Sequence, residues 1–409
     1  MPVQFRNLLA ASLLISLVPL TAAADETGTT ATVPSAAASP QTVTLIQTRM
    51  QKSKLPTRTG LIALNADGTS VWKSRAFEQY MPASTMKIVT ATVALELMGK
   101  DWKPVTRVNF DPTTGTIFLI AGGDAMLTSA NLRTLATRTA DALSASGELP
   151  TTLRVDDSLF PAPTLPPGVT AGQQPQEVNP VRALVVDRRI GMDSSATASK
   201  LFASYLASAG VPVSYKGRGK AAGTEIASFA GIRLQGSLRT MLWYSDNDIA
   251  EMTFRLSALA AGRSATWADA RITAFEQLTK FGVPTKDVAL IDGSGLSRSN
   301  RLSAFVLADV LRVAALNERT KPLRELLPSA GVEGTVRGRF HTKPSMCVQG
   351  ELKVKTGGLR DVVSLAGYAP ASDGSFRPFA IIVNGLHSTS EGNRARRSID
   401  ALAASFSGC

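Results

Sequence analysis

The stretch "MPASTMKIVTATVALELMG", residues 81–99, decides both the fold and the chemistry to expect of this chain. Ser84 and Lys87 stand three residues apart at the start of a predicted helix, where side chains at i and i+3 share one face. They are either a nucleophile with its lysine base or a helix cap with a solvated lysine. The residues that follow are apolar nearly all round until Gly99, which is a natural helix stop. We therefore expect a helix buried at the centre of a domain.

The same Ser-x-x-Lys pattern occurs a second time, at Ser70 and Lys73. That pair lies in a predicted hairpin strand beside the turn Asp67-Gly68, and in a strand positions i and i+3 point to opposite faces. Only Ser84 and Lys87 can therefore meet. A serine hydroxyl becomes a nucleophile when a neighbouring base takes its proton, and a lysine desolvated among apolar side chains can be that base.

Two further motifs follow in the chain, Ser245-Asp246-Asn247 and Lys355-Thr356-Gly357. The second triplet occurs once, although at this composition it is expected only roughly 0.1 times by chance. The Ser-x-Asn pattern is weaker, because Ser129-Ala130-Asn131 also matches it and is typical of a helix cap. Ser-x-x-Lys, Ser-Asp-Asn and Lys-Thr-Gly in this order are the signature of penicillin-binding proteins and class A β-lactamases.

The chain resembles the low-molecular-mass penicillin-binding proteins of the D-Ala-D-Ala carboxypeptidase/endopeptidase type, which carry an insertion between the first two motifs. The resemblance runs from about residue 43 to the end, through "PASTMK", "GGD", "VDDSLF", "YSDNDIAE", "DGSGLSRSNR", "LPSAGVEGT" and "VKTGGL". It implies an α/β (α+β) fold like that of penicillin-binding proteins and serine β-lactamases. In that fold an antiparallel sheet formed by both chain ends is flanked by helices, with an inserted smaller domain. The stretch between Lys87 and Ser245 is too long for a compact β-lactamase.

The resemblance also implies a role for each motif residue. Ser84 is the expected acylated nucleophile and Lys87 its base. Ser245 is expected to relay a proton to the leaving group, and Asn247 to line the pocket beside it. No metal or cofactor is implied.

The last motif is expected to bind the terminal carboxylate of the substrate through Lys355 and Thr356, since a cation beside a hydroxyl suits that anion. Gly357 and Gly358 complete this substrate-binding segment, and the backbone N–H of Gly358 is expected to form an oxyanion hole with that of the nucleophile. Strand alternation places Lys355 and Thr356 on opposite faces, so we expect Thr356 to reach the pocket from a locally distorted strand end.

Composition divides the chain into segments. The first residues form a charged start, an apolar core of about 13 residues and a small-residue end, the layout of a secretory signal peptide and shorter than a membrane span. This predicts export to the periplasm or cell-wall side, with the segment cleaved or kept as an anchor. The expected divisions are a signal peptide (1–24), a flexible leader (25–40), a catalytic domain (41–104 and 229–409) and a loop-rich inserted domain with a small core of its own (105–228).

The formal net charge is +12, yet the basic residues are scattered and no aromatic-basic cluster for stacking bases is present, which argues against nucleic acid. Association with a cell wall or lipid headgroups fits this charge, and so does general solubility. Cys347 and Cys409, the only cysteines, either pair in an oxidising compartment or stay as thiols. Two histidines, His341 and His387, leave no local support for a Ser-His-Asp hydrolase or a zinc peptidase.

The sequence thus predicts an exported serine-type D-Ala-D-Ala carboxypeptidase/endopeptidase that acts on peptidoglycan stem peptides and is acylated by β-lactams. One alternative is a β-lactamase of the same fold, although the insertion has no clear Glu-x-x-x-Asn segment to hold a deacylating water. A noncatalytic wall-binding or sensor module is another, against which the intact motifs argue. Asp292-Gly293-Ser294-Gly295 and Gly122-Gly123-Asp124 are each either a substrate loop or a tight turn.

Overall fold

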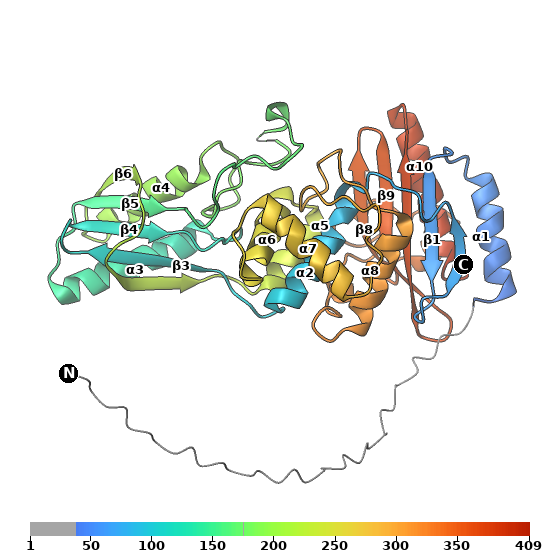
Figure 1. Ribbon diagram of the computed structural model, residues 1–409, viewed down its shortest axis with the longest axis horizontal. Coiled ribbons are helices and arrows are strands. Elements are labelled where there is room, and N and C mark those ends of the chain that lie inside the picture. The colour runs from blue at the N-terminus through green and yellow to red at the C-terminus, as the bar shows by residue number, and fades with distance from the viewer. Residues whose placement is uncertain (1–37, 175) are drawn as a thin grey trace, which may run out of the picture. The chain divides into compact units, whose positions relative to one another are not determined.

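A five-stranded antiparallel sheet joins the two ends of the described chain (Figure 1). The computed structural model describes residues 38–174 and 176–409, so the predicted signal peptide and nearly all of the predicted leader lie outside the described residues. The strands, in spatial order, are β2 (Ser70–Ser74), β1 (Thr59–Leu64), β10 (Phe376–Asn384), β9 (Val362–Pro370) and β8 (Lys353–Leu359). The predicted hairpin and the sheet built from both chain ends are both confirmed.

The two faces of this sheet bury alternate residues of each strand. Leu61 and Ala63 of β1 face a core shared with α1 (Pro40–Lys52) and α10 (Thr389–Ser405), whereas Ile62 and Leu64 face the helices on the other side. The period-2 pattern of a strand thus supplies both layers. α1 was not predicted, because it lies where the leader was expected to end and only Thr42 and Ile46 of it are fully buried.

The second layer consists of helices. They are α2 (Met86–Met98), α5 (Leu234–Tyr244), α6 (Asn247–Ala260), α7 (Trp267–Lys280), α8 (Ala304–Leu316) and the short α9 (Leu323–Leu326). Of these, α2, α5 and α6 contain or flank the first two motifs. Every residue of α2 from Met86 to Leu95 is buried, and Gly99 ends the helix with a positive φ of 77°, as the sequence predicted. No helix in the described part of the chain combines the length and apolar character that crossing a membrane requires.

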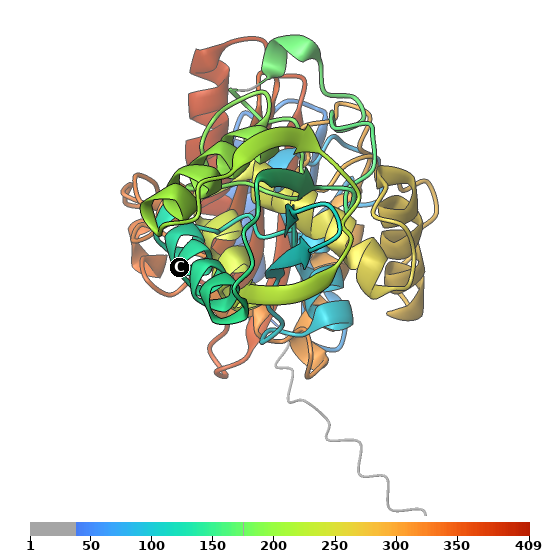
Figure 2. The ribbon, with the colours of Figure 1, turned by 90° about the vertical axis from the view of Figure 1, so that its left-hand side faces the viewer.

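A second five-stranded sheet is built from residues between the first two motifs. Its order is β6 (Ser214–Arg218), β5 (Thr152–Asp156), β4 (Thr116–Ile120), β3 (Val105–Asp111) and β7 (Thr224–Ala230). Figure 2, which looks toward this region, shows α3 (Ser129–Ser146) and α4 (Ser194–Ser208) together on one side of it. Its buried apolar side chains are continuous with those around α2, which differs from the separate small core that we expected. The domain boundaries themselves stay a prediction.

Short 3-10 turns and one disulfide complete the structure. The turns are η1 (Ala83–Thr85), η2 (Ala171–Gln173), η3 (Gly334–Val336) and η4 (Met346–Val348). Cys347 in η4 is bonded to Cys409 at the C-terminus, across 62 residues of sequence. Of the two options that the sequence left open, the cysteines therefore pair.

Candidate active site

Ser84 lies in η1, directly before the first residue of α2. The preceding Ala83 has a φ of 49°, which is uncommon for a residue with a side chain and is typical of functional turns. The loop at Gly295 packs against this turn so closely that a Cβ there would lie 2.0 Å from the carbonyl oxygen of Ala83. Only glycine allows this approach, so the loop fixes the turn that presents the serine.

Lys87, the second residue of α2, is wholly buried, and its side-chain nitrogen has three polar contacts. Nζ lies 3.0 Å from Ser84 Oγ, 2.7 Å from Asn247 Oδ1 and 2.8 Å from the carbonyl oxygen of Ser294. A neutral amine satisfies the same three contacts, because its two N–H groups donate to the amide and the carbonyl while its lone pair accepts the serine O–H. The geometry thus suits a general base. The loop "DGSG" contacts this base through Ser294, whereas Gly122-Gly123-Asp124 is not among the residues that line the catalytic pocket.

Two buried carboxylates organise the loop that contacts Lys87, Asp292 from within the loop and Glu251 from α6. Glu251 accepts hydrogen bonds from the backbone N–H of Ser294 (2.8 Å) and from Trp267 Nε1 (2.8 Å), and Asp292 accepts them from within the same loop. Burial raises the pKa of Glu251 to about 7 and raises that of Asp292. Burial lowers the pKa of Lys87 to about 8, and attraction to the two carboxylates limits the decrease. The lysine is therefore partly neutral near physiological pH.

Ser245 and Lys355 form a second hydroxyl-lysine pair across the pocket. Ser245 ends α5 with a φ of 59°, so that the chain breaks before α6 and turns the hydroxyl toward β8. Lys355 is wholly buried, and its Nζ donates to Ser245 Oγ at 2.9 Å and to the carbonyl oxygen of Thr356 at 2.8 Å. Burial, followed by the charge of Lys87, holds the pKa of Lys355 well below its usual range. A substrate carboxylate would supply the counter-charge that this lysine lacks.

Thr356 lines the same pocket, but the strand that carries it is regular. β8 pairs with β9 in continuous register from Lys353 to Leu359, so the locally distorted strand end that we expected is wrong. The reason is that β8 is the outermost strand of the sheet, and the pocket lies along its free edge. Thr356 Oγ1 lies 2.7 Å from Thr335 Oγ1, which orients the hydroxyl.

The two glycines after Thr356 have different surroundings. A Cβ at Gly357 would lie 2.1 Å from Ser364 Oγ and 3.1 Å from the backbone nitrogen of Ser84, so this glycine allows β8 to approach the serine turn. Gly357 does not line the pocket, whereas Gly358 does and has no atom closer than 4.0 Å to an added Cβ.

The pocket that these elements enclose has a volume of about 680 Å³. Of the residues that the motifs predicted, Ser84, Ser245, Asn247, Thr356 and Gly358 line it. The other lining residues are Gln173, Glu177, Leu296, Arg298, Thr335, Leu359, Arg360 and Arg396. Leu296, Arg298, Thr335 and Leu359 lie in the quoted segments "DGSGLSRSNR", "LPSAGVEGT" and "VKTGGL", although no role was assigned to them. Gln173, Glu177, Arg360 and Arg396 were missed because they come from distant segments that share no motif spacing.

A segment of the insertion holds the second motif in place. The backbone N–H and the side-chain amide of Asn179 donate to the carboxylate of Asp248, at 2.8 and 2.6 Å. Asn247 Nδ2 donates to the carbonyl oxygen of Glu177 at 2.7 Å. Arg188 forms an ion pair with Asp246. Three successive residues around the motif are thus contacted from the insertion.

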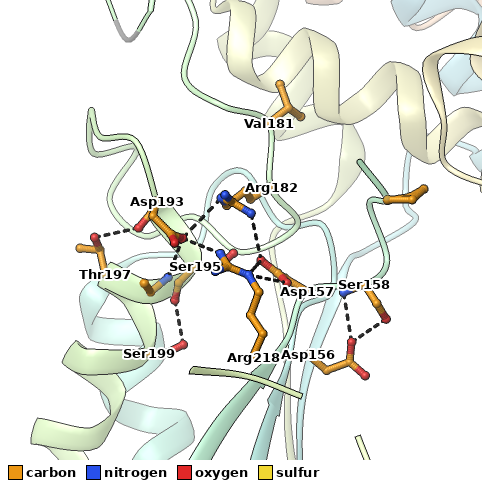
Figure 3. A network of polar contacts seen from close by, with 12 residues as sticks. Asp156, Asp157, Ser158, Val181, Arg182, Asp193, Ser195, Thr197, Ser199 and Arg218 are labelled. Atoms are coloured by element: carbon orange, nitrogen blue, oxygen red, sulfur yellow. Dashed lines mark hydrogen bonds and ion pairs between the residues drawn. The ribbon is translucent and has the colours of Figure 1, made fainter. Parts of the chain in front are cut away.

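The same segment is tied to the second sheet by a network of two arginines and two aspartates (Figure 3). Arg218 of β6 bonds Asp157 at 3.0 Å and Asp193 at 2.7 Å. Arg182 lies 3.6 Å from Asp157 and 3.4 Å from Asp193. The network is partly exposed, so its contribution is mainly to orient the segment.

No group of three or more His, Cys, Asp or Glu side chains within the described ranges is arranged to hold a metal ion. His341 and His387 are exposed and do not line the catalytic pocket. The reactive groups that the structure brings together are Ser84 and Lys87. A serine bonded to a buried lysine of lowered pKa, with a second lysine-hydroxyl pair opposite, is the constellation of enzymes that form an acyl-serine intermediate.

Comparison with known proteins defines the family. The chain belongs to the D-Ala-D-Ala carboxypeptidase 3 (S13) family, which matches residues 43–192 and 172–406. Carboxypeptidase DacB of Mycolicibacterium smegmatis is 32% identical over 374 residues, covering 86% of this chain and 80% of that protein. Carboxypeptidase Rv3627c of Mycobacterium tuberculosis is 30% identical over 405 residues, covering 93% of this chain and 86% of that protein. The family that the motifs predicted is thereby confirmed, and the chain is a peptidase of the carboxypeptidase type.

Solved structures share the fold. Penicillin-binding protein 4 (DacB) of Haemophilus influenzae superposes with a TM-score of 0.75 at 21% identity, covering 87% of this chain and 98% of that one. Its complex with a β-lactam superposes with a TM-score of 0.69 at 22% identity and the same coverage. The predicted fold class, with helices around a mixed arrangement of two sheets, is confirmed.

Proposed function

We propose that this enzyme removes the terminal D-alanine from peptidoglycan stem peptides through an acyl-enzyme on Ser84. The observation that carries the proposal is the 3.0 Å contact between Lys87 Nζ and Ser84 Oγ, in a pocket that is also lined by Ser245, the acceptor of a hydrogen bond from Lys355. The first pair supplies nucleophile and base. The second supplies a cation for the carboxylate that ends the substrate.

Acylation begins when Ser84 Oγ attacks the carbonyl carbon of the penultimate D-alanine and its proton passes to Lys87 Nζ. The backbone N–H groups of Ser84 and Gly358 are the proposed donors to the oxyanion. The C–N bond then breaks, Ser245 gives its proton to the departing amine of the terminal D-alanine, and Lys355, which donates to Ser245 Oγ, replaces that proton. In the second half of the reaction, water attacks the ester carbonyl carbon and gives up one proton to Lys355. The C–O bond to Ser84 then breaks, Lys87 returns its proton to Ser84 Oγ, and the shortened peptide leaves as a carboxylic acid.

Lys355 and Thr356 are proposed to hold the terminal carboxylate during the first half of the reaction. The strained amide of a β-lactam presents a carbonyl and a carboxylate in similar positions, so it would acylate the same serine. Its amine remains tethered after ring opening, which leaves a long-lived adduct. The β-lactam complex of the Haemophilus influenzae protein supports this extension.

The test is to incubate the chain with labelled penicillin, map the adduct by mass spectrometry, and measure D-alanine release from a synthetic pentapeptide. We expect one label on Ser84, no label in Ser84→Ala, and D-alanine release that penicillin abolishes. Label on another residue, or release that persists in Ser84→Ala, would refute the mechanism.

A serine β-lactamase is the second candidate, because Glu177 from the insertion lines the pocket next to Asn247. A carboxylate at this place could activate the water that cleaves the acyl-enzyme. Penicillin turnover distinguishes the two functions. Fast, continuous hydrolysis that slows in Glu177→Gln would favour the β-lactamase, whereas a single burst of one penicillin per enzyme favours the carboxypeptidase.

The proposed substrate lies outside the cytoplasmic membrane, so we also propose that the enzyme is exported and acts at the cell wall. The positive net charge of +12 agrees with work on an anionic polymer. Cell fractionation with an antibody to the chain would test this placement. Recovery in the cytoplasm would contradict it.

A further inference from the structure

A groove with a strongly positive lining lies between α1 and α10, apart from the catalytic pocket. Its volume is about 740 Å³, and α1 and α10 pack against each other along it. Six of its lining residues are cationic and none is acidic, while Leu45, Pro344 and Ala401 supply apolar surface. The cationic residues of this α1–α10 groove are Arg49, Lys52, Lys54, Lys343, Arg394 and Arg397.

These six cations have no anionic partner among residues 38–174 and 176–409. None of them takes part in an ion pair there, whereas Arg182 of the insertion loop and Arg218 of β6 are each paired with two aspartates (Figure 3). Arg49 is held in place by a hydrogen bond from Nη1 to the carbonyl oxygen of Ala401 at 2.7 Å. Like charges around one hollow repel, so an anion bound in the groove would relieve the repulsion.

Helix α10 connects this groove to the catalytic pocket. Arg394 and Arg397 line the groove, whereas Arg396, on another side of the same helix, lines the pocket that contains Ser84. Arg394 and Arg397 are three residues apart and therefore share one face of the helix, whereas Arg396 lies two positions after Arg394 and points to another side. Arg360 also lines the catalytic pocket, so positive charge continues from the pocket over α10 into the groove.

We propose that the α1–α10 groove is an exosite for the polymeric substrate. It would bind carboxylates on stem peptides of the peptidoglycan strand next to the one in the catalytic pocket, with the apolar lining against sugar faces. The identity of this ligand rests on the proposed function. The groove is concave, and its lining lacks the exposed large apolar side chains by which a protein inserts into a bilayer, so the structure favours a polymer chain over a membrane surface.

The experiment measures sedimentation of the full chain, carrying Ser84→Ala to prevent turnover, with purified peptidoglycan freed of attached phosphate polymers. The groove variant combines Lys52→Gln, Lys343→Gln and Arg397→Gln. Loss of three cations should raise the peptidoglycan concentration for half-binding about tenfold, and added salt should reduce the difference. A matched control, Arg271→Gln, Lys280→Gln and Lys286→Gln, removes three exposed cations outside the groove and should bind within about twofold of the parent.

Three outcomes would overturn the proposal. The first is equal binding of peptidoglycan by the groove variant and the control variant. The second is undiminished binding of the parent to peptidoglycan whose carboxylates have been amidated. The third is groove-dependent binding only to anionic phospholipid vesicles or to phosphate polymers. D-Alanine release from a soluble pentapeptide is measured in the same triple variants with Ser84 intact and should be unchanged. If the parent enzyme releases no D-alanine, the proposed function fails, whereas loss of polymer binding alone concerns only the exosite.

Discussion

At the scale of single residues, the site depends on two lysines that burial makes less basic. Lys87 has the carboxylates of Asp292 and Glu251 nearby, and their attraction limits the decrease of its pKa to about 8. Lys355 has only burial and the charge of Lys87 acting on its pKa, which lies well below its usual range. The first lysine is suited to accept a proton, and the second to gain charge when a carboxylate arrives.

The pH dependence of kcat/KM for a D-Ala-D-Ala peptide should report the pKa of Lys87. Below about 8 the lysine is increasingly protonated and cannot accept the serine proton, so kcat/KM should rise with pH and level off above this value. Lys87→Arg keeps the charge but removes the base, and should lower kcat/KM by at least about 100-fold. A flat profile between pH 6 and about 9 would argue against Lys87 as the base.

Gly357→Ala should impair catalysis because the added Cβ would lie 2.1 Å from Ser364 Oγ, which donates to the carbonyl oxygen of Pro82 at 2.7 Å. Displacing this contact shifts the turn before Ser84, and we expect kcat/KM to fall about 100-fold. Gly338→Ala is the control, since its Cβ would have no atom within 4 Å and this residue does not line the pocket. Equal losses in the two variants, measured alongside their melting temperatures, would contradict the steric explanation.

At the scale of elements, the break between α5 and α6 places Ser245 and Asn247 in the pocket. Ser245 leaves the helix in a left-handed conformation, and the carboxylate of Asp246 caps the next helix by accepting from Ile249 N at 2.9 Å. The insertion stabilises this break through Asn179, which is nearly fully buried. Asn179 acts by positioning, because it bonds Asp248 directly after the motif and does not line the substrate pocket.

Asn179→Ala should leave one oxygen of the half-buried Asp248 without its amide donor. We expect a loss of about 1–3 kcal/mol in the free energy of unfolding. We also expect kcat/KM to fall about tenfold as the Ser245–Asn247 turn loosens. Arg188→Gln is the control, because its ion pair with Asp246 is partly exposed and should be worth at most about 1 kcal/mol. Urea denaturation measures the free energy of unfolding of each variant, and kinetics on a soluble peptide measure kcat/KM. An unchanged kcat/KM in Asn179→Ala would show that Asn179 does not position the motif.

At the scale of the whole described chain, segments that are distant in sequence share two hydrophobic cores, one on each face of the first sheet. The apolar residues of the second sheet continue into the cluster around α2, and the two chain ends share the first sheet. The disulfide Cys347–Cys409 links the C-terminus to a loop before β8. It therefore connects two parts that lie outside the catalytic pocket.

Replacing both cysteines with serine should lower the free energy of unfolding by about 2–4 kcal/mol, because the unfolded chain regains the freedom of a long closed loop. Activity on a soluble peptide should change little, since neither cysteine lines the pocket. Reducing agent should lower the free energy of unfolding of the parent by the same amount and should not change that of the double variant. A parent stability that is insensitive to reduction would show that the bond contributes nothing.

The sequence by itself determined the family, the three motifs, the central helix after Ser84 and the sheet formed from both chain ends. These features follow from local spacing and periodicity, which a linear pattern carries. The sequence left the pairing of Cys347 and Cys409 open and mistook Thr356 for a residue on a distorted strand end. Only the tertiary structure showed the pair bonded and the pocket on the free edge of β8.

The tertiary structure also decided which residues without a motif surround the serine. Glu177, Arg360 and Arg396 come from an insertion loop, a strand end and the last helix, and no spacing in the chain relates them. The lowered pKa of Lys87 likewise depends on burial by segments as distant as Ser294 and Asn247. Motifs specify which groups react, whereas burial, charge and the shape of the pocket arise only when distant segments pack together.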